Sequence, residues 1–189
     1  MSSHHIVRDN QEPAVCIVDV DSHFSEKYLG QLLEWSPTVI ALASNLDWLQ
    51  TRGIKIDILL CTADHDQEAP LQPHVQRVYY SDDYIATLFE CLKRANNTAV
   101  YLVGFKPKAE VLPYAAEFTI NLLHGVSRSI PVKRYSKWLT KDTVLRVNTV
   151  LSGELRNVKM IPSGTLIVLE DGLVDIPEQS AFFYLTEEL

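Results

Sequence analysis

Short apolar runs alternate with amphipathic segments over the first two-thirds of the chain. Most of these runs are rich in β-branched and large apolar side chains, which is the composition of strands buried on both faces of a sheet. The predicted strands are residues 14–20, 38–43, 56–61, 77–80 and 99–103.

Between these runs lie segments whose apolar residues recur at helical spacing. In one of them Ile85, Leu88 and Leu92 fall on a single stripe, which predicts an amphipathic helix. Pro113 does not exclude a helix, because proline is tolerated near a first turn. The predicted helices are residues 25–35, 45–50, 82–94 and 111–124. Strands that alternate with helices predict an α/β fold, with a mostly parallel sheet flanked by helices.

The pattern changes near residue 130. Beyond it, short β-branched runs are separated by Ser-Gly, Pro-Ser-Gly and Asp-Gly turns, and no helix of ordinary length is predicted. Such a pattern is typical of a small antiparallel sheet or sandwich. We therefore predict an α/β domain over residues 1–130 and a small all-β C-terminal domain over residues 131–189.

Composition and charge narrow the class of function. The chain has 189 residues, of which 47% are hydrophobic and 22% charged, as is ordinary for a soluble globular protein. No apolar run approaches the ~20 residues that span a bilayer, and residues 1–12 lack the features of a secretion signal. The net charge of −7 argues against a duplex nucleic-acid partner. We expect a cytoplasmic protein with neither a membrane nor a nucleic-acid partner.

The cysteines predict no covalent or metal framework. Cys16, Cys61 and Cys91 are odd in number, widely spaced and set among apolar neighbours. No CxxC pair offers zinc ligands. We therefore predict buried free thiols.

Residues 41–66 carry the spacing that identifies a family. They read ALASNLDWLQTRGIKIDILLCTADHD, and Gly53 and Asp57 lie where a glycine turn leads into the strand predicted at residues 56–61. This resembles the thiamine pyrophosphokinases, in which a strand ending in Asp-Gly-Gly-Ala precedes a Gly-x-x-Pro-Asp turn and a strand ending in Gly-Asp-x-Asp-Ser. Later segments match in outline, namely DDYIATLFECL and VYLVGFKPKAEVLPYAAEFTINLL. The resemblance covers nearly the whole chain in order and spacing, and it implies a small C-terminal β domain and a homodimer.

The resemblance also implies a reaction, in which a pyrophosphoryl group passes from ATP to thiamine and yields AMP and thiamine diphosphate. Such transfer needs carboxylates that hold Mg²⁺ against the phosphates, and it needs glycines where the backbone approaches the nucleotide. Here Ala43 stands at the first family aspartate, Ser44 and Asn45 stand at the two glycines, and Thr62 replaces a further aspartate. The chain resembles a divergent member with eroded catalytic motifs, so we expect weak catalysis or none.

Two acids that match family positions, together with four residues in the matching segments, define the candidate site. Asp64 and Asp83 match two family acids and are the candidate catalytic residues and Mg²⁺ ligands. The candidate nucleotide-binding residues are Ser44, Asn45, Lys106 and Lys108. ATP and Mg²⁺ are the implied cofactors if the protein is active, and the expected ligand is a nucleotide or a thiamine-like molecule. A structural explanation stays open, because an acid at a helix start complements the helix dipole without any metal.

Two other classes of function stay open. Asp19 and Asp21 follow the first predicted strand as an Asp-x-Asp pair, the placement of the nucleophile and acid of a haloacid-dehalogenase-type phosphatase. Residues 58–62 would then be the strand whose terminal threonine, Thr62, holds phosphate, although the expected later lysine and acids do not follow in order. The other alternative is a purely structural or assembly homologue.

Overall fold

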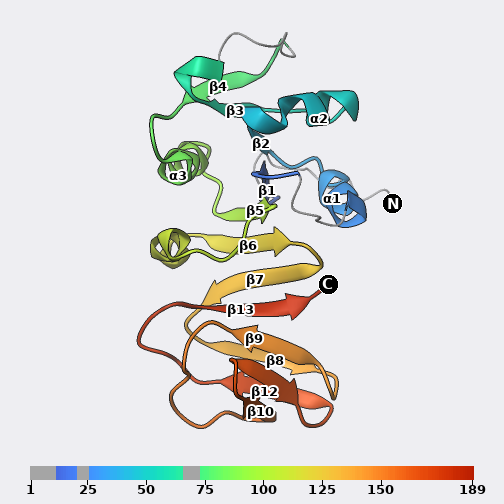
Figure 1. Cartoon of the computed structure of the whole chain (residues 1–189), viewed down its shortest axis with the longest axis vertical. Helices are drawn as coiled ribbons and strands as arrows, with labels where there is room; N and C mark the ends of the chain where they lie inside the picture. The colour runs from blue at the N-terminus through green and yellow to red at the C-terminus, as the bar shows by residue number, and fades with distance from the viewer. Residues whose placement is uncertain (1–11, 21–25, 66–72) are drawn as a thin grey trace, which may run out of the picture.

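The computed structural model describes residues 12–20, 26–65 and 73–189 (Figure 1). The elements up to residue 124 are β1 (Ala14–Ile17), α1 (Glu26–Leu33), β2 (Val39–Leu42), the 3₁₀ helix η1 (Ala43–Asn45), α2 (Leu46–Thr51), β3 (Ile58–Cys61), η2 (Ala63–His65), β4 (Gln76–Tyr79), α3 (Tyr84–Arg94), β5 (Ala99–Val103), η3 (Ala109–Ala116) and β6 (Thr119–His124). The elements after residue 124 are β7 (Ser127–Val132), β8 (Tyr135–Leu139), β9 (Val144–Val147), β10 (Val158–Ile161), β11 (Thr165–Val168), β12 (Gly172–Ile176) and β13 (Phe183–Glu188).

One large mixed sheet runs through the whole molecule. Its eleven strands have the order β10-β11-β9-β13-β7-β6-β5-β1-β2-β3-β4. The six strands from β6 to β4 are parallel to one another. The strands from β7 to β10 are antiparallel to theirs. The α/β class and the mostly parallel sheet of the first two-thirds are therefore confirmed.

Helices cover both faces of the parallel part. Leu29 of α1 and Leu49 of α2 pack on one face with the odd-numbered side chains of β1. Phe89 of α3 and Val111 of η3 pack on the opposite face. Figure 1 shows the same arrangement, with α1 and α2 on one side of the sheet and α3 on the other. Because each central strand is buried on both faces, it has the continuous apolar sequence that predicted it.

The C-terminal third consists of strands and turns. A second, two-stranded sheet of β12 and β8 contributes Tyr135, Val174 and Ile176 to a separate core. Leu145 of β9 and Leu185 of β13 complete that core from the large sheet. The boundary predicted near residue 130 lies inside β7, which pairs with β6 on one edge and with β13 on the other. The two regions therefore share one sheet, and the division into domains stays a prediction.

The predicted helix at residues 111–124 is wrong. The structure has the 3₁₀ helix η3 (Ala109–Ala116), which contains Pro113, followed by the strand β6 (Thr119–His124). β6 lies between β5 and β7, and its residues 120–123 are all buried. An apolar run that is buried on both faces does not show whether it is a helix or a strand, since its periodicity is lost.

The cysteine prediction is confirmed, because Cys16, Cys61 and Cys91 are buried thiols outside any disulfide. In the described part of the chain, no helix is long and apolar enough to cross a membrane.

Candidate functional site

A cleft of about 520 Å³ opens at the carboxyl ends of the central parallel strands. From β1 the chain first builds β2, β3 and β4 on one side, and then places β5 on the other side of β1. The chain leads from β1 to α1 on one face of the sheet and from β5 to η3 on the other face, and α/β sheets bind ligands at such a switch point. The lining residues are Val18, Asp19, Tyr84, Gly104, Phe105, Lys106, Lys108 and His124.

The loop that leaves β1 forms one wall of the cleft and packs against Gly104. The amides of Val18 and Asp19 both donate to the carbonyl of Val103, at 2.9 and 3.4 Å. Gly104 has a φ of +76°, and a Cβ at this position would lie 1.8 Å from the Asp19 carbonyl oxygen. Only glycine fits this left-handed position and this close approach of two backbones.

Asn45 holds the same loop from the other side. Its side chain is buried, with 4% exposed. Nδ2 donates to the carbonyls of Ile17 at 3.3 Å and Val18 at 3.0 Å, and Oδ1 accepts from the amide of Val20 at 3.3 Å. One amide therefore satisfies three backbone groups of a loop that has left its strand, as buried polar groups require.

The opposite wall carries the positive charge of the cleft. Lys108 pairs with Glu110 at 3.4 Å, and its ammonium lies 5.2 Å from the centre of the Phe105 ring. The hydroxyl of Tyr184 donates to the Lys108 carbonyl at 2.7 Å, which fixes the loop after β5 to β13. Lys106 lines the cleft without an ion pair to any described residue. Its ammonium is therefore available to an anion.

Tyr84 adds a neutral donor. It is the first residue of α3, so the N-terminus of that helix lies at the cleft. Burial, followed by smaller effects of Cys16, Glu110, Tyr80 and Asp83, raises the pKa of Tyr84 to about 12. The phenol therefore stays protonated at neutral pH and can donate a hydrogen bond to an anion.

The structure does not bring the predicted acids together in the cleft. Asp83 is the N-cap of α3, and its Oδ1 accepts from the amides of Ile85 at 2.8 Å and Ala86 at 3.3 Å. Asp64 is exposed on η2 and does not line the cleft. Asp19, the first acid of the alternative phosphatase motif, does line it. Asp21, the second acid of that motif, lies outside the described residues.

The described residues do not fit the Mg²⁺ site that the resemblance implies. Over residues 12–20, 26–65 and 73–189, no group of three or more His, Cys, Asp or Glu side chains is placed to hold a metal ion. The best-placed acid of the predicted pair, Asp83, already accepts two backbone hydrogen bonds as a helix cap. Mg²⁺ is usually held by one or two carboxylates together with substrate phosphates, and the carboxylate among the described lining residues of the cleft is that of Asp19, which is not one of the predicted pair.

The four predicted nucleotide-binding residues separate into two pairs. Lys106 and Lys108 line the cleft together. Ser44 is exposed on η1, and Asn45 turns its amide to the loop after β1, so neither lines the cleft. The sequence interpretation missed His124, which lies at the end of β6 rather than in a helix. It also missed Tyr84, although Tyr84 lies in the first turn of the helix predicted at residues 82–94.

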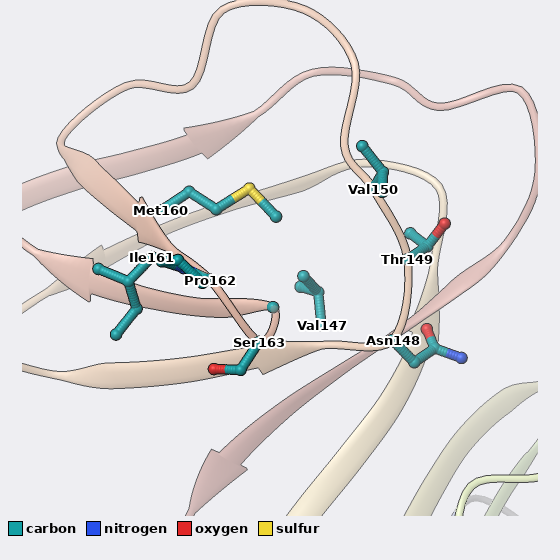
Figure 2. A pocket seen from close by; sticks show the side chains of 9 residues that line it. Val147, Asn148, Thr149, Val150, Met160, Ile161, Pro162 and Ser163 are labelled. Carbon is teal, nitrogen blue, oxygen red and sulfur yellow. The ribbon is translucent and has the colours of Figure 1, made fainter.

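A second cleft, of about 720 Å³, lies in the C-terminal region. Figure 2 shows its side chains, which come from the end of β9, the segment that follows β9, and the β10–β11 hairpin. None of the lining residues is charged, and Val147, Val150 and Met160 give it an apolar surface. The Oδ1 of Asn148 already accepts from the amide of Tyr184 at 2.8 Å. The second cleft therefore offers a phosphate no positive charge among its lining side chains.

Solved structures share this architecture. No model of a known protein family matches the chain, and no curated protein matches it in sequence. A protein from Lactobacillus plantarum superposes with a TM-score of 0.66 at 12% identity, covering 94% of this chain and 99% of that one. A probable thiamine pyrophosphokinase from Staphylococcus saprophyticus superposes with a TM-score of 0.62 at 8% identity, covering 93% and 98%. The thiamine pyrophosphokinase of Bacillus subtilis gives 0.59 at 12% identity, covering 94% and 99%.

The chain is therefore an α/β protein with a ligand-type cleft at the switch point of a large mixed sheet. Its fold is that of the thiamine pyrophosphokinases, which confirms the fold that the sequence resemblance implied.

Proposed function

We propose that this protein is a thiamine pyrophosphokinase-like protein that binds a small phosphate-bearing molecule in the cleft and does not catalyse pyrophosphoryl transfer. The ligand is a nucleotide or a thiamine diphosphate-like molecule. The observation that carries the proposal is the lysine wall of the cleft, where the ammonium of Lys106 has no ion-pair partner among the described residues.

The chemistry of the cleft suits a phosphate. Lys106 supplies an available positive charge, and the protonated phenol of Tyr84 supplies a neutral donor from the adjacent wall. The N-terminus of α3 adds little to this attraction, because the Asp83 carboxylate already accepts from the amides of Ile85 and Ala86 there. Asp19 opposes an anion, and Lys108 shares its charge with Glu110. Lys106 is therefore the residue on which affinity for phosphate depends most.

The positions of the acids support the absence of transfer. Pyrophosphoryl transfer relies on metal-bound phosphates that carboxylates hold in place. Asp83 is engaged as a helix cap, and Asp64 lies outside the cleft. These two residues were the only candidates that the family spacing left for that role. The described cleft therefore supports binding and gives no arrangement for the reaction.

Two measurements on the purified chain test this function. Calorimetry with ATP, thiamine diphosphate and inorganic pyrophosphate is expected to detect binding of at least one of them, and Lys106→Ala is expected to weaken it. The matched control is Lys159→Ala, since Lys159 is exposed on β10, far from the cleft in the sheet order. Incubation with ATP, Mg²⁺ and thiamine is expected to release no AMP above a protein-free control. Thiamine-dependent AMP release would show an active enzyme, and failure to bind all three compounds would refute the ligand role.

The phosphatase alternative keeps one supporting observation, because Asp19 lines the cleft. Thr62, its proposed phosphate holder, follows β3, and β2 lies between β3 and β1. The two strand ends are therefore two strand spacings apart, about 10 Å. That separation disfavours joint contact with one phosphate. Hydrolysis of a phosphoester that is lost in Asp19→Asn would support the alternative.

We also propose that the protein forms a homodimer. The proposal rests on the family resemblance, and sedimentation equilibrium tests it.

A further inference from the structure

Asn45 and Gly104 enclose the loop that leaves β1 from opposite sides. Gly104 approaches the Asp19 carbonyl so closely that a Cβ would lie 1.8 Å from its oxygen. Asn45 reaches the same loop from η1, which follows the neighbouring strand β2. The loop contributes Val18 and Asp19 to the cleft. Its position therefore sets the width of the cleft on the side that faces Lys106.

The Asn45 side chain adds three hydrogen bonds to the two that the loop makes with β5. The amides of Val18 and Asp19 are bonded to Val103 of β5. The carbonyls of Ile17 and Val18 and the amide of Val20 are all bonded to the Asn45 side chain. The partners lie 25 to 28 residues away in sequence. Three backbone groups of the loop therefore depend on this one side chain, whereas the amides of Val18 and Asp19 depend on Val103.

We propose that Asn45 is a positioning residue for ligand binding: it holds the β1 exit loop, residues 17–20, in the conformation that lets the cleft admit a phosphate. This role rests on the proposed function and deepens it. The glycine that the family resemblance places at this position has no side chain. The chain therefore replaces a position of close backbone approach with a buried amide that fixes the neighbouring loop. Asn45 acts through the loop and does not line the cleft.

A pair of substitutions distinguishes positioning from general stability. Asn45→Asp keeps the shape but places a carboxylate against two carbonyl oxygens, which repel it. Because burial and these carbonyls favour the neutral carboxyl, the pKa of the introduced acid is raised. Below that pKa its hydroxyl donates to the Val18 carbonyl while its other oxygen accepts from Val20. Asn45→Gly removes all three hydrogen bonds and cannot recover them at any pH.

Calorimetric titration with inorganic pyrophosphate provides the binding readout. At about pH 8, Asn45→Asp is expected to weaken affinity by about tenfold relative to wild type, the typical effect of a lost buried hydrogen bond. At about pH 5, where the introduced carboxyl is protonated, most of that loss is expected to be recovered. Asn45→Gly is expected to stay weak at both values. Asp19, Tyr84, Lys106, Lys108 and His124 also line the cleft, so each variant is compared with wild type at the same pH, which cancels the pH effects that all variants share.

The matched control is Asn97→Asp, because Asn97 is equally buried, with 2% exposed, and does not line the cleft. It is expected to lower stability without changing the affinity ratio at either pH. Equal loss of affinity at both pH values in Asn45→Asp, or an equal loss in Asn97→Asp, would overturn the positioning role.

Amide hydrogen exchange of Val20 in the ligand-free protein separates this role from the proposed function. The exchange is expected to accelerate in Asn45→Gly and to be unchanged in Asn97→Asp. Unchanged exchange of Val20 in Asn45→Gly would show that Asn45 does not hold the loop, whether or not pyrophosphate binds. If the exchange accelerates but wild type binds no pyrophosphate, the proposed function fails, and the role in ligand binding fails with it.

Discussion

Gly104→Ala tests the backbone contact that shapes the cleft. The alanine Cβ would lie 1.8 Å from the Asp19 carbonyl oxygen, about half the ~3.5 Å of an ordinary van der Waals contact. The Asp19 oxygen is a backbone atom and the alanine Cβ is bonded directly to the backbone, so no side-chain rotation relieves the clash. The loop after β1 or the loop after β5 must move.

Two costs add in this variant. A non-glycine residue in the left-handed region costs roughly 1 to 2 kcal/mol, and Gly104 has a φ of +76°. Forcing an extra methyl group into a packed site costs about 1 to 3 kcal/mol more. We therefore expect the free energy of unfolding to fall by roughly 2 to 5 kcal/mol.

Gly125→Ala is the matched control for this substitution. Gly125 has a φ of +59°, and a Cβ there would meet no atom within 4 Å. It should therefore lose only the conformational part, about 1 to 2 kcal/mol. Urea unfolding gives the free energy of unfolding of both variants. The comparison is valid when the slope of that free energy against urea concentration is the same as in wild type. Equal losses in the two variants would refute the close approach of Gly104 to Asp19.

Three further predictions address the charge, the helix cap and the tyrosines. Lys106→Ala should weaken pyrophosphate binding about tenfold through the loss of a charged hydrogen bond, whereas Lys159→Ala should leave calorimetric affinity unchanged; the reverse order would contradict the lysine wall. Asp83→Ala should lower the free energy of unfolding by about 1 kcal/mol, and Asp83→Asn should restore most of it because asparagine also caps helices, as thermal unfolding will show; full loss in the asparagine variant would argue for a role of the negative charge. Burial raises the pKa of Tyr84, Tyr135 and Tyr184 to about 12, so the unfolded chain releases these protons first and stability should fall as pH rises from about 10 to 12. Denaturant unfolding across that range checks the trend, and a stability that is constant there would contradict it.

The local pattern of the sequence predicted most of the elements because the central strands are short and buried on both faces. β1, β2, β3 and β5 each coincide with an apolar run, and α3 with its amphipathic stripe. The helix predicted where β6 lies was wrong for the same physical reason. Its residues are apolar on both faces, so they carry no period that separates a strand from a helix, and only the pairing with β5 and β7 decides.

The site depends on long-range order that no local pattern contains. Lys106 was a candidate because it lies in a segment that matches the family in outline, but its place in one cleft with Asp19 requires β1 and β5 to be neighbours. Asn45 was placed by spacing at a family glycine, and its side-chain partners 25 to 28 residues away were not predictable from that spacing. From the sequence, Asp83 fitted either a catalytic acid or a helix cap. In the structure its carboxylate accepts two backbone hydrogen bonds, as a helix cap does.

Backbone amide chemical shifts during titration with inorganic pyrophosphate test the central claim most directly, because they locate the ligand. The account predicts that shift changes cluster at residues 18–20, at the first turn of α3 and at residues 104–108, and that Lys106→Ala needs about tenfold more pyrophosphate to reach them. Shift changes confined to residues 147–150 and 160–164, the lining of the second cleft, would contradict it. So would the absence of any change at saturating pyrophosphate.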